Sequence, residues 1–356
     1  MALTNLIGKG FSMGTRSVLD GSRGNTGHLK LGEESVGKRE QAITDQMIAS
    51  IKAISRQRHP DGVIKRFNQS KGLGCFDASF EVIPDLPANL KVGLFAHARS
   101  YPARIRFANA TQDDDNKKDF RGMSIKLLDV EGTSLWGENG TQDFILNSYP
   151  ALFAANPEHF LDFINATRED RTWAYLTNPS HWYSLNVVMS GRKKIASPFD
   201  ISYFSTTPYR FGMNKSVAVK YAVTPCSTYE SKMSEPNDRN YLSIAMNRHL
   251  EKEDACFEFK VQFQKDAKHM PVENSAVVWD ESESPFISVA KITISKQDFF
   301  GEQAVARCES MSFNPWQSLP EHKPIGGINR VRGAVYAALS EFRQSENQAR
   351  VGTKIK

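Results

Sequence analysis

Apolar and polar residues alternate in several short segments of the first half of the chain. Such alternation is typical of strands with one buried face, and it predicts strands at 78–82, 103–107, 124–129 and 143–147. The pattern returns in the second half, where it predicts strands at 216–222, 256–263 and 286–294. Many short strands separated by turns rich in Gly, Asp and Asn favour a closed or nearly closed antiparallel sheet.

Other segments repeat apolar residues every three or four positions, as a helix with one buried face does. The first covers 44–58, where Thr44 can cap a helix whose apolar stripe holds Met47, Ile51 and Ile54. Further helices are predicted at 157–166, 180–194, 241–252 and 330–348, and a connection marked by Pro and Gly at 300–328. Residues 1–40 are rich in Gly, Ser and charge and predict a partly disordered N-terminal arm before a single α+β domain at 41–350.

The composition is that of an ordinary soluble globular protein: 356 residues, 40% of them hydrophobic and 24% charged. The formal charge of +5 is spread along the chain rather than gathered in a basic stripe, so we expect no nucleic-acid partner. No apolar run approaches the roughly 18 residues that cross a bilayer, and residues 1–10 lack the pattern of a secretory signal. A mild positive balance suits an anionic substrate or cofactor.

The four cysteines, Cys75, Cys226, Cys256 and Cys308, lie far apart in the sequence and form no CxxC pair. This spacing disfavours a zinc site and a dense disulfide framework. It favours a reducing compartment, and we therefore expect a cytoplasmic location.

Near the end of the chain, Arg332, Tyr336 and Arg343 stand at helical spacing. On a helix, this spacing puts one phenol between two guanidinium groups on the same face. A nearby cation favours the ionised phenolate, which suits ferric iron and is one of the few proximal ligands that proteins give haem. The same spacing also fits an ordinary amphipathic helix with Leu339 and Phe342 inward. Other segments of the sequence are therefore needed to choose between a haem ligand and an ordinary surface helix.

Six segments occur in the order in which haem catalases have them, and from about residue 60 to residue 348 the chain resembles the short, catalase-related members of that family. The segments are RFNQSKG at 66–72, PARIRF at 102–107, DFRGMSIK at 119–126, NSYP at 147–150, VWD at 278–280 and, after Glu309, Phe313 and Pro315, the tyrosine helix. The resemblance implies a catalase-like antiparallel eight-stranded β-barrel with surrounding and C-terminal helices. It also implies haem b, iron protoporphyrin IX, as the cofactor.

The resemblance assigns roles at the matching positions. Tyr336 becomes the proximal ligand of the iron, and Arg332 its charge partner. Arginines suit the haem propionates because a guanidinium group binds a carboxylate through two parallel hydrogen bonds. The three arginines implied for the propionates are Arg66, Arg106 and Arg343. Two phenylalanines, Phe107 and Phe160, are also implied to contact the cofactor, and Phe160 would lie along the distal face or the access channel.

On the distal side, the resemblance places Asn147 near the bound oxygen ligand, with Asn68 and Gln69 beside it. Here the chain departs from its family, because catalases have a histidine where this chain has Gln69. A glutamine amide cannot take up a proton at physiological pH. General acid–base catalysis typically contributes about 10²–10⁴-fold, so we expect only weak disproportionation of hydrogen peroxide.

Catalase-related proteins include allene oxide synthases, which act on fatty-acid hydroperoxides. The resemblance therefore implies homolytic O–O cleavage by a ferric tyrosinate haem, which requires less proton transfer than heterolysis. The leading hypothesis is a haem enzyme that acts on an organic hydroperoxide, first of all a fatty-acid hydroperoxide. The alternatives are a hydrogen-peroxide-dependent peroxidase or catalase, a haem lyase or oxygenase of a nitrogen-containing metabolite, and a non-enzymatic haem-binding or sensor protein. Contact with a lipid surface and assembly into a homo-oligomer stay open.

Overall fold

The structure is a computed structural model that describes residues 29–233 and 238–354. Most of the predicted N-terminal arm, residues 1–28, lies outside the described residues. The rest of the arm contacts the folded domain. Arg330 bonds the carboxylate of Glu34 at 2.7 Å, and the backbone N–H of Gly32 donates to the side chain of Gln264 at 2.7 Å. These contacts hold the chain against the domain just before its first described helix.

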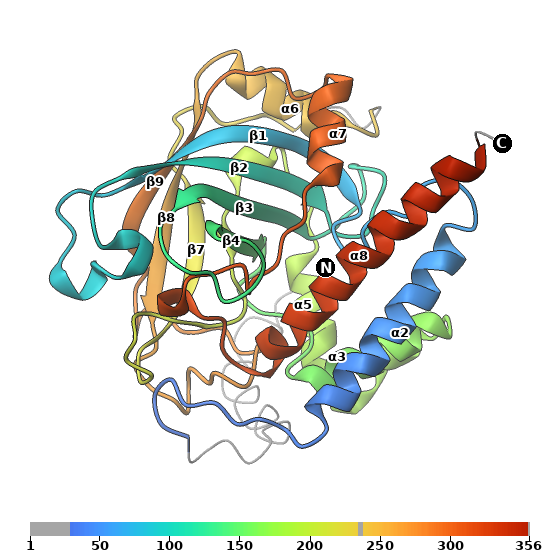
Figure 1. Ribbon diagram of the computed structural model, residues 1–356, viewed down its shortest axis with the longest axis horizontal. Helices are drawn as coiled ribbons and strands as arrows, with labels where there is room; N and C mark the ends of the chain where they lie inside the picture. The colour runs from blue at the N-terminus through green and yellow to red at the C-terminus, as the bar shows by residue number, and fades with distance from the viewer. Residues whose placement is uncertain (1–28, 234–237, 355–356) are drawn as a thin grey trace, which may run out of the picture.

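Eight strands close into an antiparallel barrel (Figure 1). Around the barrel they lie in the order β5 (Tyr203–Phe204), β4 (Gly140–Asn147), β3 (Arg121–Val130), β2 (Ser100–Asn109), β1 (Lys71–Val82), β9 (Ile287–Ile294), β8 (Ala255–Phe263) and β7 (Ala218–Pro225). The ring closes where β5 pairs with β7, and a further short strand, β6 (Tyr209–Arg210), pairs with the start of β7. The predicted α+β fold with an eight-stranded antiparallel barrel is confirmed.

Each of the seven predicted strands overlaps a strand of the barrel. The largest difference is at β1, which begins at Lys71 rather than at residue 78. Its register against β2 shifts between Gly72 and Gly74, and such a bulge interrupts the alternation on which the prediction rested. Strands β5 and β6 were not predicted, because two residues are too few to show a period.

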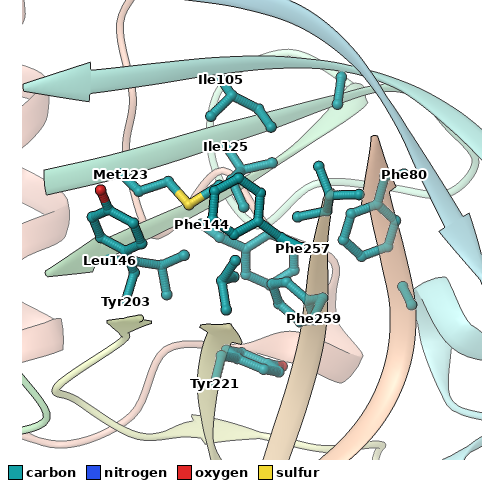
Figure 2. Packing of buried hydrophobic residues seen from close by; sticks show 14 of the residues in the cluster. Phe80, Ile105, Met123, Ile125, Phe144, Leu146, Tyr203, Tyr221, Phe257 and Phe259 are labelled. Atoms are coloured by element: carbon teal, nitrogen blue, oxygen red, sulfur yellow. The ribbon is translucent and has the colours of Figure 1, made fainter. Parts of the chain in front are cut away.

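The barrel interior is filled by large apolar side chains, many of them aromatic (Figure 2). The rings of Phe144 and Phe259 lie 4.7 Å apart between centroids, and those of Phe80 and Phe259 lie 5.2 Å apart. Each buried ring removes about 150–250 Å² of surface from water, and tilted or edge-on ring pairs add about 0.5–1.5 kcal/mol. The interior is thus a packed core, with no room for a ligand among these rings.

Three helices form a layer beside the barrel: α2 (Glu40–Arg58), α3 (Pro157–Arg168) and α8 (Gly327–Lys354) (Figure 1). Their apolar stripes meet in one cluster, built from Ile43, Met47, Ile51, Ile54, Leu161, Ile164, Val331 and Val335. The other described α-helices are α4 (Thr172–Thr177), α5 (Trp182–Gly191), α6 (Tyr241–Leu250) and α7 (Glu302–Ser310). In the described ranges, no helix is both long and apolar enough to cross a membrane.

Two helix predictions require correction. Helix α2 begins at Glu40, so Thr44 is not its cap; the Thr44 hydroxyl donates back to the carbonyl of Glu40 at 2.8 Å. Helix α7 lies within 300–328, which was predicted to be a connection without a helix. Its nine residues bury a single side chain, Cys308, so the sequence shows too weak an apolar stripe to reveal it.

The cysteines form two disulfides, Cys75–Cys308 and Cys226–Cys256, with Cα–Cα distances of 5.7 and 5.0 Å. The expectation of reduced cysteines is therefore wrong, and the argument for a cytoplasmic location loses this support. The expectation rested on the wide spacing of the cysteines in the sequence. Cys75 and Cys308 are 233 positions apart, yet they meet where α7 packs on β1.

Candidate functional site

A cavity of about 650 Å³ lies between the outer wall of the barrel and the helices α2, α3 and α8. Of the ten residues predicted for the site, nine line this one cavity although they come from distant parts of the sequence. They are Arg66, Asn68, Gln69, Arg106, Asn147, Phe160, Arg332, Tyr336 and Arg343.

The barrel wall of the cavity is formed by outward-facing residues of β2, β3 and β4. Side chains of a strand alternate between its two faces, so one row across the three strands holds Arg106, Ser124 and Ile145. The next row on the same face, two residues along each strand, holds Ala108, Gly122 and Asn147. The register of the sheet therefore brings an arginine and an amide to the same cavity from two strands.

The same alternation corrects the role predicted for Phe107. Phe107 follows Arg106 on β2, so its ring points to the opposite face, into the barrel interior. There it is fully buried and contacts the rings of Phe76, Phe199 and Tyr203. Phe107 does not line the cavity, and the prediction that it contacts a cofactor is wrong.

Gln69 lies over the glycine of the second row. Its backbone takes a left-handed conformation, with φ of 56°, and its N–H donates to the carbonyl of Ala110 at 2.9 Å. A Cβ atom at Gly122 would come within 2.2 Å of the Gln69 side-chain amide, so the glycine makes the space that this amide occupies. The amide forms no hydrogen bond within the described part of the chain.

The two predicted partners of Gln69 differ in their surroundings. The Oδ1 atom of Asn147 is buried and has no hydrogen-bond partner among the described residues. Leaving such a group unpaired costs about 1–3 kcal/mol, so this atom is placed for a ligand rather than for stability. Asn68 also lines the cavity, but this residue is exposed.

Across the cavity from the barrel wall, α8 contributes the arginine and tyrosine pair. The Nη2 atom of Arg332 donates to the Tyr336 hydroxyl at 3.3 Å. Its Nη1 atom donates to Thr207 and to Asn329, both at 3.2 Å, which fixes the guanidinium group beside the phenol. Burial lowers the pKa of Arg332, but its contacts with Tyr336 and Tyr209 raise it above its ordinary value, so the guanidinium group stays charged.

Three arginines converge on one carboxylate at another part of the wall. Arg66 bonds Glu309 at 2.5 Å, Arg106 lies 3.5 Å from the same carboxylate, and Arg343 donates to the Glu309 backbone carbonyl at 2.9 Å. Burial, followed by the charge of Arg66, lowers the pKa of Arg106 to about 10. Three cations against one anion leave two positive charges in excess, which matches a ligand with two carboxylates.

The third wall is apolar. Phe160 of α3 packs against Phe153 and Phe163 with ring centroids 5.6 and 6.5 Å apart, and Val335 and Leu339 of α8 lie on the same cavity. Aromatic and aliphatic faces of this kind suit a flat apolar ligand.

The cavity is strongly cationic as a whole. Among the described residues that line it, two are acidic, Asp113 and Asp119, and eight are arginine or lysine: Arg58, Lys65, Arg66, Arg106, Arg121, Arg192, Arg332 and Arg343. Its one histidine in the described ranges is His59, at the end of α2, where the His59 carbonyl accepts from Arg350 at 2.9 Å. Arg350 is fourteen residues past Tyr336 on α8, about 21 Å along the helix axis, so the backbone of His59 lies near the part of α8 that follows the tyrosine by several turns.

Several residues that support or line the site were not predicted from the sequence. Asn329 supports Arg332 from three positions earlier on the same helix, a spacing that the sequence displays. Thr207 and Arg192 come from other segments, and no pattern in the sequence links them to the tyrosine helix.

The residues present fit haem. A phenol with a fixed guanidinium neighbour offers an axial ligand, the excess of arginines can receive two propionates, and apolar walls accept the macrocycle. The unpaired Asn147 Oδ1 atom and the Gln69 amide both line the cavity and could bind a small oxygen ligand there. The described residues contain no group of three or more His, Cys, Asp or Glu that could hold a bare metal ion. Fold and site together define a β-barrel protein with a cavity suited to haem.

A family model for catalases matches residues 27–325, and the chain belongs to the catalase family. Helix α8 lies beyond the matched residues, so the geometry of the cavity carries the tyrosine assignment. An allene oxide synthase-lipoxygenase protein from Plexaura homomalla is 23% identical over 56% of this chain and 20% of its own length. A catalase from Aliivibrio fischeri is 22% identical over 77% of this chain and 61% of its own.

Solved structures show the same fold. Catalase A from Saccharomyces cerevisiae superposes with a TM-score of 0.65 and 19% identity, over 81% of this chain and 62% of that one. A fungal catalase gives a TM-score of 0.65 with 17% identity, over 81% of this chain and 61% of its own. This chain thus spans less than two thirds of the length of these relatives.

Proposed function

We propose that this protein is a haem-dependent enzyme that acts on an organic hydroperoxide, with fatty-acid hydroperoxides as its substrate class and haem b as its cofactor. Tyr336 would hold the iron, with Arg332 stabilising the phenolate. Arg66, Arg106 and Arg343 would bind the propionates. Membership of the catalase family and the similarity to an allene oxide synthase-lipoxygenase protein support this proposal.

The observation that carries the proposal is Gln69 over Gly122. In the proposed site this amide would take the position where efficient disproportionation of hydrogen peroxide requires a proton-transferring side chain, and an amide can only donate or accept hydrogen bonds. Bound ferric haem supplies one-electron chemistry at the peroxide oxygens. The described residues then orient the substrate: Gln69 and Asn147 hydrogen-bond the peroxide oxygens, and the phenylalanine wall excludes water and holds an apolar chain.

A product assay on the haem-loaded protein tests this proposal. The protein is incubated with a polyunsaturated fatty-acid hydroperoxide without an electron donor, and in parallel with hydrogen peroxide while oxygen release is recorded. We expect complete conversion of the fatty-acid hydroperoxide to a rearranged or dehydrated product, together with slow oxygen release. Free haemin at the same concentration is the control for chemistry that does not depend on the protein.

Other outcomes would favour the alternatives. Rapid oxygen release would indicate a catalase, and conversion that requires an added electron donor would indicate a peroxidase. Binding of cyanide or azide without consumption of any peroxide would indicate a sensor or a haem-binding protein. Each of these results contradicts the proposed function.

A further inference from the structure

Two arginines flank a buried carboxylate on the cavity wall, away from the three arginines around Glu309. The Asp119 carboxylate accepts from the N–H groups of Thr111 and Gln112 at 2.7 and 2.8 Å, and from the Thr111 hydroxyl at 3.0 Å. Arg121 lies 4.0 Å and Arg192 3.9 Å from it, beyond hydrogen-bond distance. The loop backbone therefore satisfies Asp119 without either guanidinium group.

The two arginines differ in what else they contact. Arg121 is almost fully buried and donates to Asn109 at 2.9 Å and to the carbonyl of Lys117 at 3.4 Å. The Arg192 side chain forms no hydrogen bond within the described ranges, and its Nε atom is buried without a partner. Because this side chain is 36% exposed and lines the cavity, its donors are available to a ligand.

The backbone places Arg192 close to the distal side. Asp119 and Lys193 exchange two backbone hydrogen bonds, of 3.3 and 3.2 Å. From Phe120, the next residue after Asp119, hydrogen bonds run through Ala110 to Gln69, with lengths of 3.0 and 2.9 Å. The backbone of Lys193, next to Arg192, is therefore connected through three successive backbone pairings to the backbone of Gln69.

The surface leading to Arg192 is apolar. Val188 precedes it by one helical turn on α5, and Leu176 of α4 lines the same cavity. An apolar wall that ends in a guanidinium group whose donors form no hydrogen bond with the described residues suits an amphiphile, whose chain lies along the wall and whose anionic head meets the arginine.

We infer that Arg192 binds the carboxylate of the substrate and selects acids over neutral hydroperoxides of the same chain. This inference rests on the proposed function, since it takes the substrate to be a fatty acid. A guanidinium group binds a carboxylate through two parallel hydrogen bonds, which also fixes the end of the chain and thereby the position of the peroxide group.

A binding measurement tests the inference without any turnover. The probe is the hydroxy fatty acid that corresponds to the hydroperoxide, together with its methyl ester, and calorimetry measures the Kd of each for the haem-loaded protein. Arg192→Gln should weaken binding of the acid by about 10- to 100-fold, because hydrogen bonds to charged groups contribute about 1.5–3 kcal/mol. Binding of the ester should not change.

Two further variants sharpen the result. Arg192→Lys keeps the charge but not the paired donors, and should weaken acid binding less than Arg192→Gln does. Lys193→Gln removes the charge of the adjacent exposed lysine and should leave both ligands unaffected. The inference is overturned if the wild type does not prefer the acid, or if Arg192→Gln weakens both ligands equally or neither.

The outcome is separable from that of the proposed function. If the acid binds through Arg192 but its hydroperoxide is not converted, the proposed function fails and the carboxylate site stands. If the hydroperoxide is converted and Arg192→Gln has no effect on acid binding, the inference fails alone.

Discussion

The inner and outer faces of the same three strands serve different purposes. On the inner face of β2, β3 and β4, Phe107 and Phe144 pack against other aromatic rings, and Ile125 belongs to the same buried apolar cluster. Figure 2 shows Ile125 and Phe144 in this cluster. On the outer face, Arg106 and Asn147 are also buried or partly buried, yet each carries a polar atom without a partner. Burial alone does not distinguish the two faces, since Arg106 is 1% exposed and Phe107 0%. On these three strands the outer face differs from the inner one by its buried polar atoms without a described partner, which a ligand in the cavity could satisfy.

The barrel interior and the cavity also differ in the charged groups that they contain. The interior admits a titratable ring, His322, in its neutral form, since burial lowers the pKa of His322 to about 3. The cavity instead keeps more guanidinium groups than carboxylates. Excess buried charge lowers the free energy of unfolding in the absence of an anion. An anionic cofactor that binds in the cavity would raise it again.

Adjacent residues of β2 provide the sharpest test of this comparison. Phe107→Ala should lower the free energy of unfolding by about 3–5 kcal/mol, because it leaves a void in a packed core. Arg106→Met should change that free energy by about 1 kcal/mol or less, since Arg66 still pairs Glu309, yet it should lower haem affinity about 10-fold. Chemical denaturation of the haem-free protein and haem titration measure the two quantities. A reversed pattern would contradict the assignment of the faces.

Two phenols extend the comparison. Tyr336→Phe should lower haem affinity by about 100-fold or more, because it removes the axial ligand, and loss of mere supporting groups already costs about 10–100-fold. Tyr221→Phe, inside the barrel, removes a 3.1 Å contact with His322 and should cost about 1 kcal/mol of stability without affecting haem. Haem retention on gel filtration separates the variants, and unchanged retention in Tyr336→Phe would refute the ligand assignment.

On the distal side, Gln69→His should raise disproportionation of hydrogen peroxide, by up to about 100-fold, since the imidazole supplies the missing proton transfer. Asn68→His puts the same ring one residue earlier, at an exposed position, and should give no gain. Oxygen release compares the two. An equal rise in both variants, or in neither, would show that position 69 does not limit the reaction.

The smallest effect concerns pH. The folded state binds a proton at His322 near pH 3 and the unfolded chain near pH 6.5, so His322 contributes stability above pH 6.5 that is lost as the pH falls toward 3. The stability advantage of the wild type over His322→Gln should therefore shrink by about 2 kcal/mol between pH 6.5 and pH 5. Denaturant titrations at the two pH values measure it. A constant difference would contradict a neutral buried ring.

Periodicity in the sequence predicted most of the barrel and the helices of the cavity, because burial on one face leaves a repeating pattern. It missed β5, β6 and the six-residue helix α4, which are too short for a period, and α7, which buries one side chain. The order of motifs brought nine of the ten predicted residues to one cavity. Phe107 was misassigned because a motif gives neighbours but not the face on which each one lies. Arg192 was missed because only the fold brings the end of α5 to the distal side.

The central claim is that the Tyr336 phenolate binds the haem iron. Resonance Raman spectroscopy of the haem-loaded protein, prepared with ordinary and with ring-deuterated tyrosine, tests it directly. We expect high-spin ferric haem with phenolate bands that shift on deuteration and disappear in Tyr336→Phe. Bands that do not shift, or that persist in Tyr336→Phe, would contradict it.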